Sequence, residues 1–386
     1  MTTRSWQGTA GRLLHRGRRA YRSRFLGTPI SAGGTRGLVL RGRVWPGGPA
    51  TPYDGAVLID SAGRVDDIGP IGELTIPDRW PVIGSASHWI GPGIVDTHVH
   101  LGFTGLAAHV CGGVVAMRDL GTPPAKVKRW QGAARRTGVR LASSGAVLTA
   151  PGGYPGQSWG RDGYAYEVTS AAHGAEAVET MLLAGAALIK IALEPGDGWP
   201  TLTPAIVDAI VETAHGHGLP VIAHALGVDM VRRALSAHVD ELAHTPTEEL
   251  PASMIEQIAE AGIRVSSTLQ TFFSAGIGRP ALRNAAAMVE AGVPLVYGTD
   301  LGNSGTVAGV DPRELDRLAQ AGLGRWGALR AATDLAACSA GFDRSLGFIR
   351  EGQIARCVVL CDDPVREPGA WRAPTAVVLH GRLIRS

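Results

Sequence analysis

The sequence predicts an α/β protein, a (β/α)8 TIM-like barrel with a small β-sandwich domain formed by the N- and C-terminal segments. The first observation is that apolar, strand-like runs alternate with amphipathic, helix-like stretches throughout residues 92–344. About eight such strand–helix units suit a closed parallel barrel. The second is that residues 37–91 and 345–386 share another pattern, in which glycine, proline and aspartate break short apolar runs. This pattern is typical of antiparallel β-structure.

The two patterns divide the chain into three parts. Residues 1–36 are predicted to be a disordered basic arm. Residues 37–91 and 345–386 together form one composite β-domain, and the barrel of residues 92–344 is inserted between them. Charge separates the arm from the rest, because residues 1–53 contain ten arginines and no acidic residue, which leaves 27 basic against 34 acidic residues, a net charge of −7, for the remainder.

The location and partners of the protein follow from what the chain lacks. The arm has no apolar core like that of a secretory signal, and no run approaches the roughly 18 apolar residues of a membrane span. Four scattered cysteines imply no disulfide framework. We therefore expect a cytoplasmic protein without a membrane partner. A solvated tail is favoured over an arm that binds nucleic acid, and the sequence leaves a homo-oligomer open.

Eight apolar runs are the predicted barrel strands, and each is followed by a loop or a helical stretch. Two of the helical stretches, 205–218 and 252–262, end on a glycine suited to a helix C-cap. An open doubly wound sheet is the alternative fold. It would carry a glycine-rich phosphate loop after the first strand, but His98 and His100 occupy that position. The predicted strands are 94–100, 114–121, 139–148, 187–193, 219–225, 239–245, 263–269 and 293–300.

Lys190 is unusual for its surroundings. It is one of three lysines in a chain that otherwise uses arginine, and it lies inside the apolar run ALIKIAL. Burying an ammonium is costly, and burial drives a lysine towards its neutral, nucleophilic form. A snorkelling or ion-paired lysine is the alternative from this stretch alone.

Potential metal ligands stand at or near the carboxyl ends of five predicted strands. Alternate residues of a strand share a face, so both histidines of DTHVH point into the barrel. In barrel enzymes the carboxyl ends of the strands build the active site. Four imidazoles and a carboxylate converging there would suit Zn²⁺ or a similar divalent ion. The residues are His98, His100, Lys190, His224, His244 and Asp300.

The segments GPGIVDTHVHLGF, IKI, IAHA, ELAH and GTD, in this order, resemble the amidohydrolase superfamily. In detail they are similar to the branch with imidazolonepropionase-like and Xaa-Pro dipeptidase-like enzymes, which have a binuclear metal centre. The likeness runs from about Leu38 to the C-terminus and includes SLGFIREGQIARCVVLCDDP near its end.

The resemblance implies two divalent ions, with zinc as the default for an imidazole-rich site. It implies that His98, His100 and Asp300 hold one ion and that His224 and His244 hold the other. A CO₂-derived carbamate on Lys190 would bridge them. The nucleophile would be a metal-bridging hydroxide, with Asp300 as the catalytic acid and base.

The chain departs from the family pattern at three places. Ala355-Arg356 and Leu335-Ala336-Ala337 differ in structural segments, which concerns the packing of the small domain. The third departure is Tyr154, in TAPGGYPGQSWG, where related sequences often have histidine. This loop would overhang the barrel mouth, so Tyr154 is a candidate substrate-binding residue; packing against the glycine-rich loop is the alternative.

The resemblance implies a hydrolase that cleaves an amide bond of a small molecule, a dipeptide or an N-acyl amino acid. One alternative is a mononuclear cyclic-amide hydrolase or deaminase in which Lys190 is incidental, with lactone or ester hydrolysis as a variant. Another is a barrel that binds without catalysis. The last is disfavoured because such relatives lose metal ligands, whereas all six positions are filled here.

Overall fold

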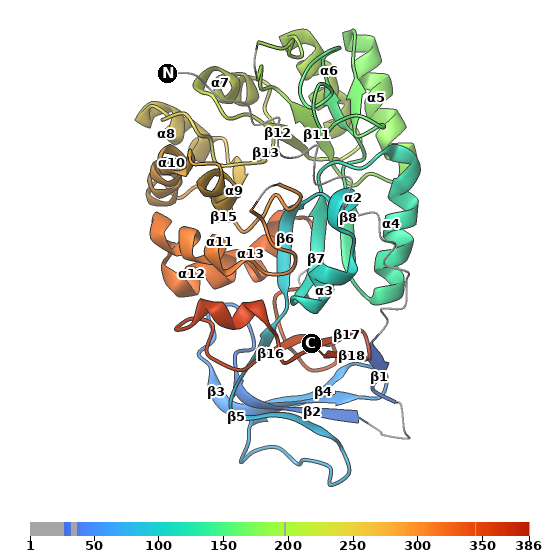
Figure 1. The fold of residues 1–386 in the computed structure, drawn as a ribbon, viewed down its shortest axis with the longest axis vertical. Helices are drawn as coiled ribbons and strands as arrows, with labels where there is room; N and C mark the ends of the chain where they lie inside the picture. The colour runs from blue at the N-terminus through green and yellow to red at the C-terminus, as the bar shows by residue number, and fades with distance from the viewer. Residues whose placement is uncertain (1–26, 32–36, 197, 304, 344, 386) are drawn as a thin grey trace.

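The computed structural model describes residues 27–31, 37–196, 198–303, 305–343 and 345–385. Figure 1 shows two regions, an antiparallel-rich sheet at the lower end and a larger region of parallel strands and helices above it. Of the arm predicted over residues 1–36, only 27–31 are described, and Thr28–Pro29 form β1, which pairs with the C-terminal strand.

The lower region is one eight-stranded sheet built from both ends of the chain. Its order is β1-β18-β17-β16-β5-β2-β3-β4. The two ends meet where β16 pairs with β5 in an antiparallel ladder. A buried apolar cluster that includes Leu38, Ile90 and Val378 draws on both ends. The other strands are β2 (Gly37–Val44), β3 (Tyr53–Asp60), β4 (Val65–Pro70), β5 (Val82–Pro92), β16 (Arg356–Leu360), β17 (Ala376–Leu379) and β18 (Arg382–Arg385).

The upper region has two parallel sheets. A three-stranded sheet has the order β6-β7-β8, and a seven-stranded sheet has the order β10-β9-β11-β12-β13-β14-β15. The strands are β6 (Ile94–Val99), β7 (Val114–Asp119), β8 (Arg140–Ser143), β9 (Val147–Thr149), β10 (Ala165–Glu167), β11 (Ile189–Ala192), β12 (Val221–His224), β13 (Glu241–Leu242), β14 (Arg264–Ser266) and β15 (Leu295–Val296).

Backbone hydrogen bonds join the two parallel sheets at both ends of the strand order. On one side, Ala187 N donates to Ser143 O over 2.9 Å, which links the end of β8 to the residues before β11. On the other side, Thr97 N donates to Tyr297 O over 3.1 Å, and Asp300 N donates to His98 O over 2.8 Å. The segment after β15 therefore lies beside β6.

Helices cover the outside of the parallel strands in Figure 1. The predicted C-caps of 205–218 and 252–262 are confirmed, since Gly218 and Gly262 both have positive φ just after their helices. The helices are α2 (Leu101–Thr104), α3 (Ala107–Cys111), α4 (Pro124–Thr137), α5 (Ala171–Ala184), α6 (Pro204–Gly216), α7 (Val228–Ser236), α8 (Ala252–Glu260), α9 (Leu269–Ser274), α10 (Gly278–Glu290), α11 (Pro312–Leu318), α12 (Gly324–Ala331) and α13 (Asp334–Ser339), with a π-turn at Ala319–Leu323 and a 3₁₀ turn at Pro368–Arg372.

Within the described part of the chain, no helix is both long and apolar enough to cross a membrane.

A buried ion pair lies among the parallel strands. Arg118 of β7 and Glu241 of β13 are both almost fully buried. Arg118 Nη1 donates to Glu241 Oε2 over 3.0 Å, and its Nη2 donates to Oε1. The remaining donors are also used, since Arg118 Nε donates to Thr97 O over 2.8 Å and Ser266 Oγ bonds to both partners. The charges are thus compensated by hydrogen bonds that tie β6, β7, β13 and β14 together.

We predict that Arg118→Ala lowers the free energy of unfolding by about 3–5 kcal/mol, because it leaves the Glu241 carboxylate buried without a cationic partner. Guanidinium chloride denaturation measures this change. The matched control is Arg283→Ala, which removes a pair to Glu249 whose side chains are largely exposed and should leave the unfolding midpoint almost unchanged. Equal losses in the two variants would contradict a structural role for the buried pair.

Candidate metal centre

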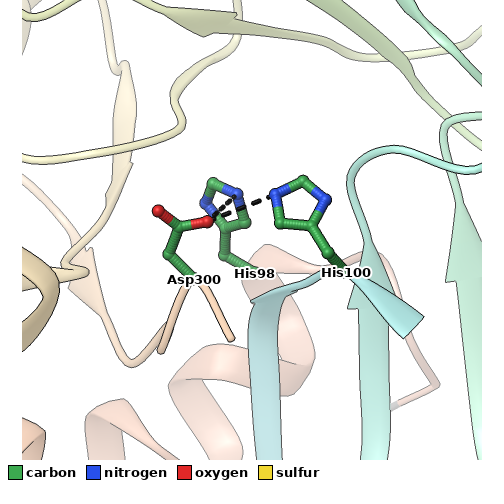
Figure 2. Close-up of side chains that lie close together, drawn as sticks. All are labelled: His98, His100 and Asp300. Atoms are coloured by element: carbon green, nitrogen blue, oxygen red, sulfur yellow. Dashed lines mark ion pairs between the residues drawn. The ribbon is translucent and has the colours of Figure 1, made fainter. Parts of the chain in front are cut away.

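Three predicted ligands meet at the ends of β6 and β15. His98 lies in β6, His100 follows it, and Asp300 follows β15. Asp300 Oδ1 lies 3.3 Å from His98 Nε2 and 3.2 Å from His100 Nε2 (Figure 2). All three side chains are buried, and their ligand atoms lie within 4.8 Å of one another. Two imidazole nitrogens and a carboxylate oxygen in this arrangement are a donor set suited to a divalent transition metal.

His224 and His244 lie beside this group. The His244 ring centroid is 4.6 Å from that of His98 and 4.7 Å from that of His224. His244 Nδ1 is 3.9 Å from Asp300 Oδ2. His224 is the last residue of β12, and His244 follows β13 closely. The structure therefore brings all four predicted imidazoles and the predicted carboxylate together at the carboxyl ends of the strands.

Lys190 is buried on the neighbouring strand β11 and faces the same group. In the parallel ladder Lys190 pairs with Ile222, and Ala192 pairs with His224. Because alternate residues share a face, Lys190 and His224 point to the same side. The charge of Lys190 contributes to lowering the pKa of His98, His224 and His244.

Burial dominates the electrostatics of the centre. It lowers the pKa of Lys190 to about 7, while the charges of Asp300 and Glu241 oppose the shift. Burial also holds the pKa of His98, His224 and His244 well below the usual value for histidine, and neighbouring cationic groups add to this effect. Neutral imidazole is the form that binds metal.

The residues present fit a divalent metal. Lys190 Nζ is buried without a hydrogen-bond partner among the described residues. A buried polar atom without a partner calls for an explanation, and a missing ion is one of the standard explanations. His98 Nδ1 lies 2.8 Å from Ala243 O, a bond that leaves Nε2 with a free lone pair on the side of Asp300.

Residues that sequence reasoning missed hold these side chains in place. Asp96 Oδ2 accepts from Thr299 Oγ1 over 2.7 Å, and its Oδ1 accepts from the backbone N–H groups of Thr299 and His98. It thus ties β6 to the segment that carries Asp300. The sequence does contain a sign of this role, because Asp96 is an acidic residue inside an apolar strand run. Thr268 Oγ1 lies 2.9 Å from His244 Nδ1, and nothing in the sequence pattern marked it.

Two loop backbones at the centre adopt an uncommon conformation. Asp300 has φ of 50° and Thr268 has φ of 46°, the left-handed region that non-glycine residues rarely occupy. Such positions concentrate at functional sites.

An aromatic wall, formed by Tyr154 and Trp159, covers one side of the centre. Both residues lie in the loop between β9 and β10. The Tyr154 ring centroid is 4.7 Å from that of His224, and the Trp159 ring centroid is 4.7 Å from that of His100. Trp159 Nε1 donates to Tyr154 Oη over 3.0 Å. Tyr154 thus lies where the sequence placed it, whereas Trp159 was missed because a loop gives no periodic signal.

Comparison with known proteins places this geometry in a family. The model of the amidohydrolase family matches residues 89–383. The uncharacterized protein Rv2915c of Mycobacterium tuberculosis is 27% identical over 339 residues, which cover 76% of this chain and 85% of that protein. The uncharacterized protein Mb2939c of Mycobacterium bovis matches to the same extent.

Two solved structures share the fold. A Xaa-Pro dipeptidase with methionine bound in its active site superposes with a TM-score of 0.77 at 21% identity, covering 91% of this chain and 100% of that chain. A prolidase complexed with N-methylphosphonate-L-proline gives a TM-score of 0.76 at 21% identity, covering 90% and 99%. Since the family model spans most of the chain and every predicted metal ligand, the chain belongs to the amidohydrolase family and is a hydrolase of C–N bonds.

Proposed function

We propose that the chain is a binuclear metal-dependent hydrolase that cleaves the amide bond of a small molecule, a dipeptide or an N-acyl amino acid. The observation that carries this proposal is Lys190. Its amine is buried on the same face of the sheet as His224, has no hydrogen-bond partner among the described residues, and has a pKa lowered to about 7. A neutral amine is what reaction with CO₂ to a carbamate requires, and the carbamate supplies an anionic oxygen ligand.

We infer that the two parallel sheets close into a (β/α)8 barrel of residues 92–344. The hydrogen bonds from Ala187 to Ser143 and from Thr97 to Tyr297 support closure on both sides. The sheet of residues 37–91 and 345–386 would fold as a β-sandwich around the apolar cluster shared by the two terminal segments.

His98, His100 and Asp300 would hold one ion and His224 and His244 a second, with the Lys190 carbamate between them. Zinc is the default metal for such an imidazole-rich set. When bound, the metal supplies a hydroxide nucleophile near neutral pH and polarises the carbonyl that is attacked. Substrate would enter against the wall of Tyr154 and Trp159, which excludes water from that side of the centre.

Asp300 is the proposed acid and base. It is the described carboxylate in contact with both His98 and His100. Its Oδ atoms would take the proton of the attacking hydroxide and deliver it to the nitrogen of the leaving amine. Asp96 holds the Asp300 backbone in position for this transfer. It accepts hydrogen bonds from the backbone N–H groups of His98 and Thr299 and from the Thr299 hydroxyl.

We predict that protein purified without chelator contains about two metal ions per chain, as two-metal hydrolytic sites do. Lys190→Ala should lose metal and turnover, because the bridging ligand is gone. Elemental analysis measures the metal, and intact mass at neutral pH detects CO₂ that acid releases. Lys128→Ala, on the exposed side of α4, is the matched control and should change neither. One ion per chain, with unchanged turnover in Lys190→Ala, would instead indicate the mononuclear cyclic-amide hydrolase or deaminase. The observation that supports this alternative is the compact group of His98, His100 and Asp300.

A second prediction concerns proton transfer. Asp300→Asn keeps the shape of the side chain but cannot carry the proton, so kcat should fall by about 10²–10⁴-fold. Steady-state kinetics on Xaa-Pro dipeptides and N-acyl amino acids measure this, with Asp229→Asn on the exposed face of α7 as the control. Full turnover in Asp300→Asn would falsify the assigned role.

A third prediction concerns the aromatic wall. Tyr154→Phe removes a hydroxyl, so we expect KM to rise by up to about tenfold through loss of one hydrogen bond to substrate. Metal content and kcat should stay near their original values. Tyr166→Phe, in β10, is the matched control. If KM does not move, Tyr154 only packs against its glycine-rich loop.

A further inference from the structure

A second cavity lies at the opposite ends of the strands from the metal centre. Its volume is about 890 Å³. It is lined where strands begin, since Arg140 is the first residue of β8, Pro220 precedes β12 and Arg264 is the first residue of β14. The metal ligands His224 and His244 instead stand where strands end. The two sites are therefore separate openings of the same strand assembly.

The cavity lining is strongly cationic. Arg135, Arg140 and Arg264 contribute guanidinium groups, and Asp240 is the one carboxylate among the described lining residues. Asp240 is already engaged, because its Oδ2 accepts from Val221 N over 2.7 Å and lies 2.9 Å from His215 Nε2. Arg140 is paired with Asp343 over 3.2 Å, and Arg264 Nε lies 3.7 Å from Glu241 Oε2. Arg135 has no carboxylate partner among the described residues, so its charge is left to act on the cavity.

The arginines have donors to spare. Within the described part of the chain, the side chain of Arg135 makes no hydrogen bond or ion pair, and that of Arg140 uses only Nη2, over 3.2 Å to Asp343. Arg264 Nε is buried without a hydrogen-bond partner among these residues; its nearest carboxylate oxygen, Glu241 Oε2, is 3.7 Å away, beyond hydrogen-bonding distance. Planar guanidiniums with open donors match the geometry of carboxylate and phosphate oxygens.

A buried hydroxyl points to a ligand independently of the charge. Ser339, at the end of α13, lines the cavity and is only 9% exposed. Its Oγ has no hydrogen-bond partner among the described residues, which is uncommon for a buried hydroxyl. A ligand oxygen in the cavity would accept from this hydroxyl once the atoms that cover Oγ move aside, whereas the exposed donors of Arg135 and Arg140 need no such movement.

The floor of the cavity favours an anion as well. Arg118 lines it, and its guanidinium is fully engaged with Glu241, Thr97 and Ser266. The Glu241 carboxylate is therefore screened by its partner and does not oppose an incoming anion. His215 is the one histidine among the described lining residues, so this part of the lining does not reproduce the cluster of imidazoles at the metal centre.

We propose that this cavity binds a small oxyanion-bearing metabolite, a phosphate or a polycarboxylate, through Arg135, Arg140, Arg264 and Ser339. Phosphate and carboxylate groups both carry pairs of anionic oxygens that a guanidinium can bind through two parallel hydrogen bonds. The site is independent of the amide substrate, and its occupancy is measurable without turnover.

The test is isothermal titration calorimetry of the metal-loaded full chain at constant ionic strength, with inorganic phosphate in one arm and citrate in the other. Saturable binding of either probe is expected, and the tighter probe identifies the source of the oxyanion. The double variant Arg135→Gln/Arg140→Gln should weaken binding at least about tenfold through loss of charge-assisted hydrogen bonds. Ser339→Ala should weaken it by a smaller factor, with an unchanged melting temperature as the check on folding.

The matched control is Arg129→Gln, which removes the same charge from an exposed position of α4 that does not line the cavity. It should leave the affinity unchanged. Equal affinity in the wild type and the double variant would place the anion elsewhere and overturn the proposal, as would the absence of saturable binding for both probes. Because no outcome depends on hydrolysis, failure here is distinguishable from failure of the proposed amidase function.

Discussion

The buried pair of Arg118 and Glu241 is the constraint on which both ends of the strand assembly depend. Removing two charges from water is costly, and the pair persists because all three Arg118 side-chain nitrogens and both Glu241 oxygens are hydrogen-bonded. These bonds fix β6, β7, β13 and β14 relative to one another. The metal ligands stand above this layer at the carboxyl ends of the strands, and the cationic cavity opens below it.

The same pair contributes to the state of Lys190. Burial is the largest cause and lowers the pKa of that lysine to about 7. The charges of Asp300 and Glu241 oppose the shift, and the charge of Arg118 reinforces it. A layer that looks purely structural thus acts on the residue proposed as the bridging ligand.

The sequence was sufficient for residues whose placement follows from strand periodicity. His98, His100, Lys190, His224, His244 and Asp300 all occupy strands or strand ends, and parallel strands bring their carboxyl ends together. Strand periodicity does not predict the other contacts that build the centre and the fold. Arg118 and Glu241 are 123 residues apart and meet only because of strand order. Trp159 lies in a loop, Thr268 depends on an uncommon backbone conformation, and β1 pairs with the far end of the chain.

The choice of lysine at position 190 is itself an argument for the chemistry. This chain uses arginine for nearly all its positive charge, including the buried Arg118 and the guanidiniums of the second cavity. Arginine serves those positions because it stays charged and presents a rigid fork of donors. It cannot serve beside four imidazoles, because a guanidinium does not lose its proton in proteins and so cannot become a metal ligand. An amine can be neutralised by burial and can then react with CO₂. The one buried lysine therefore stands where the proposed mechanism needs reactivity rather than charge.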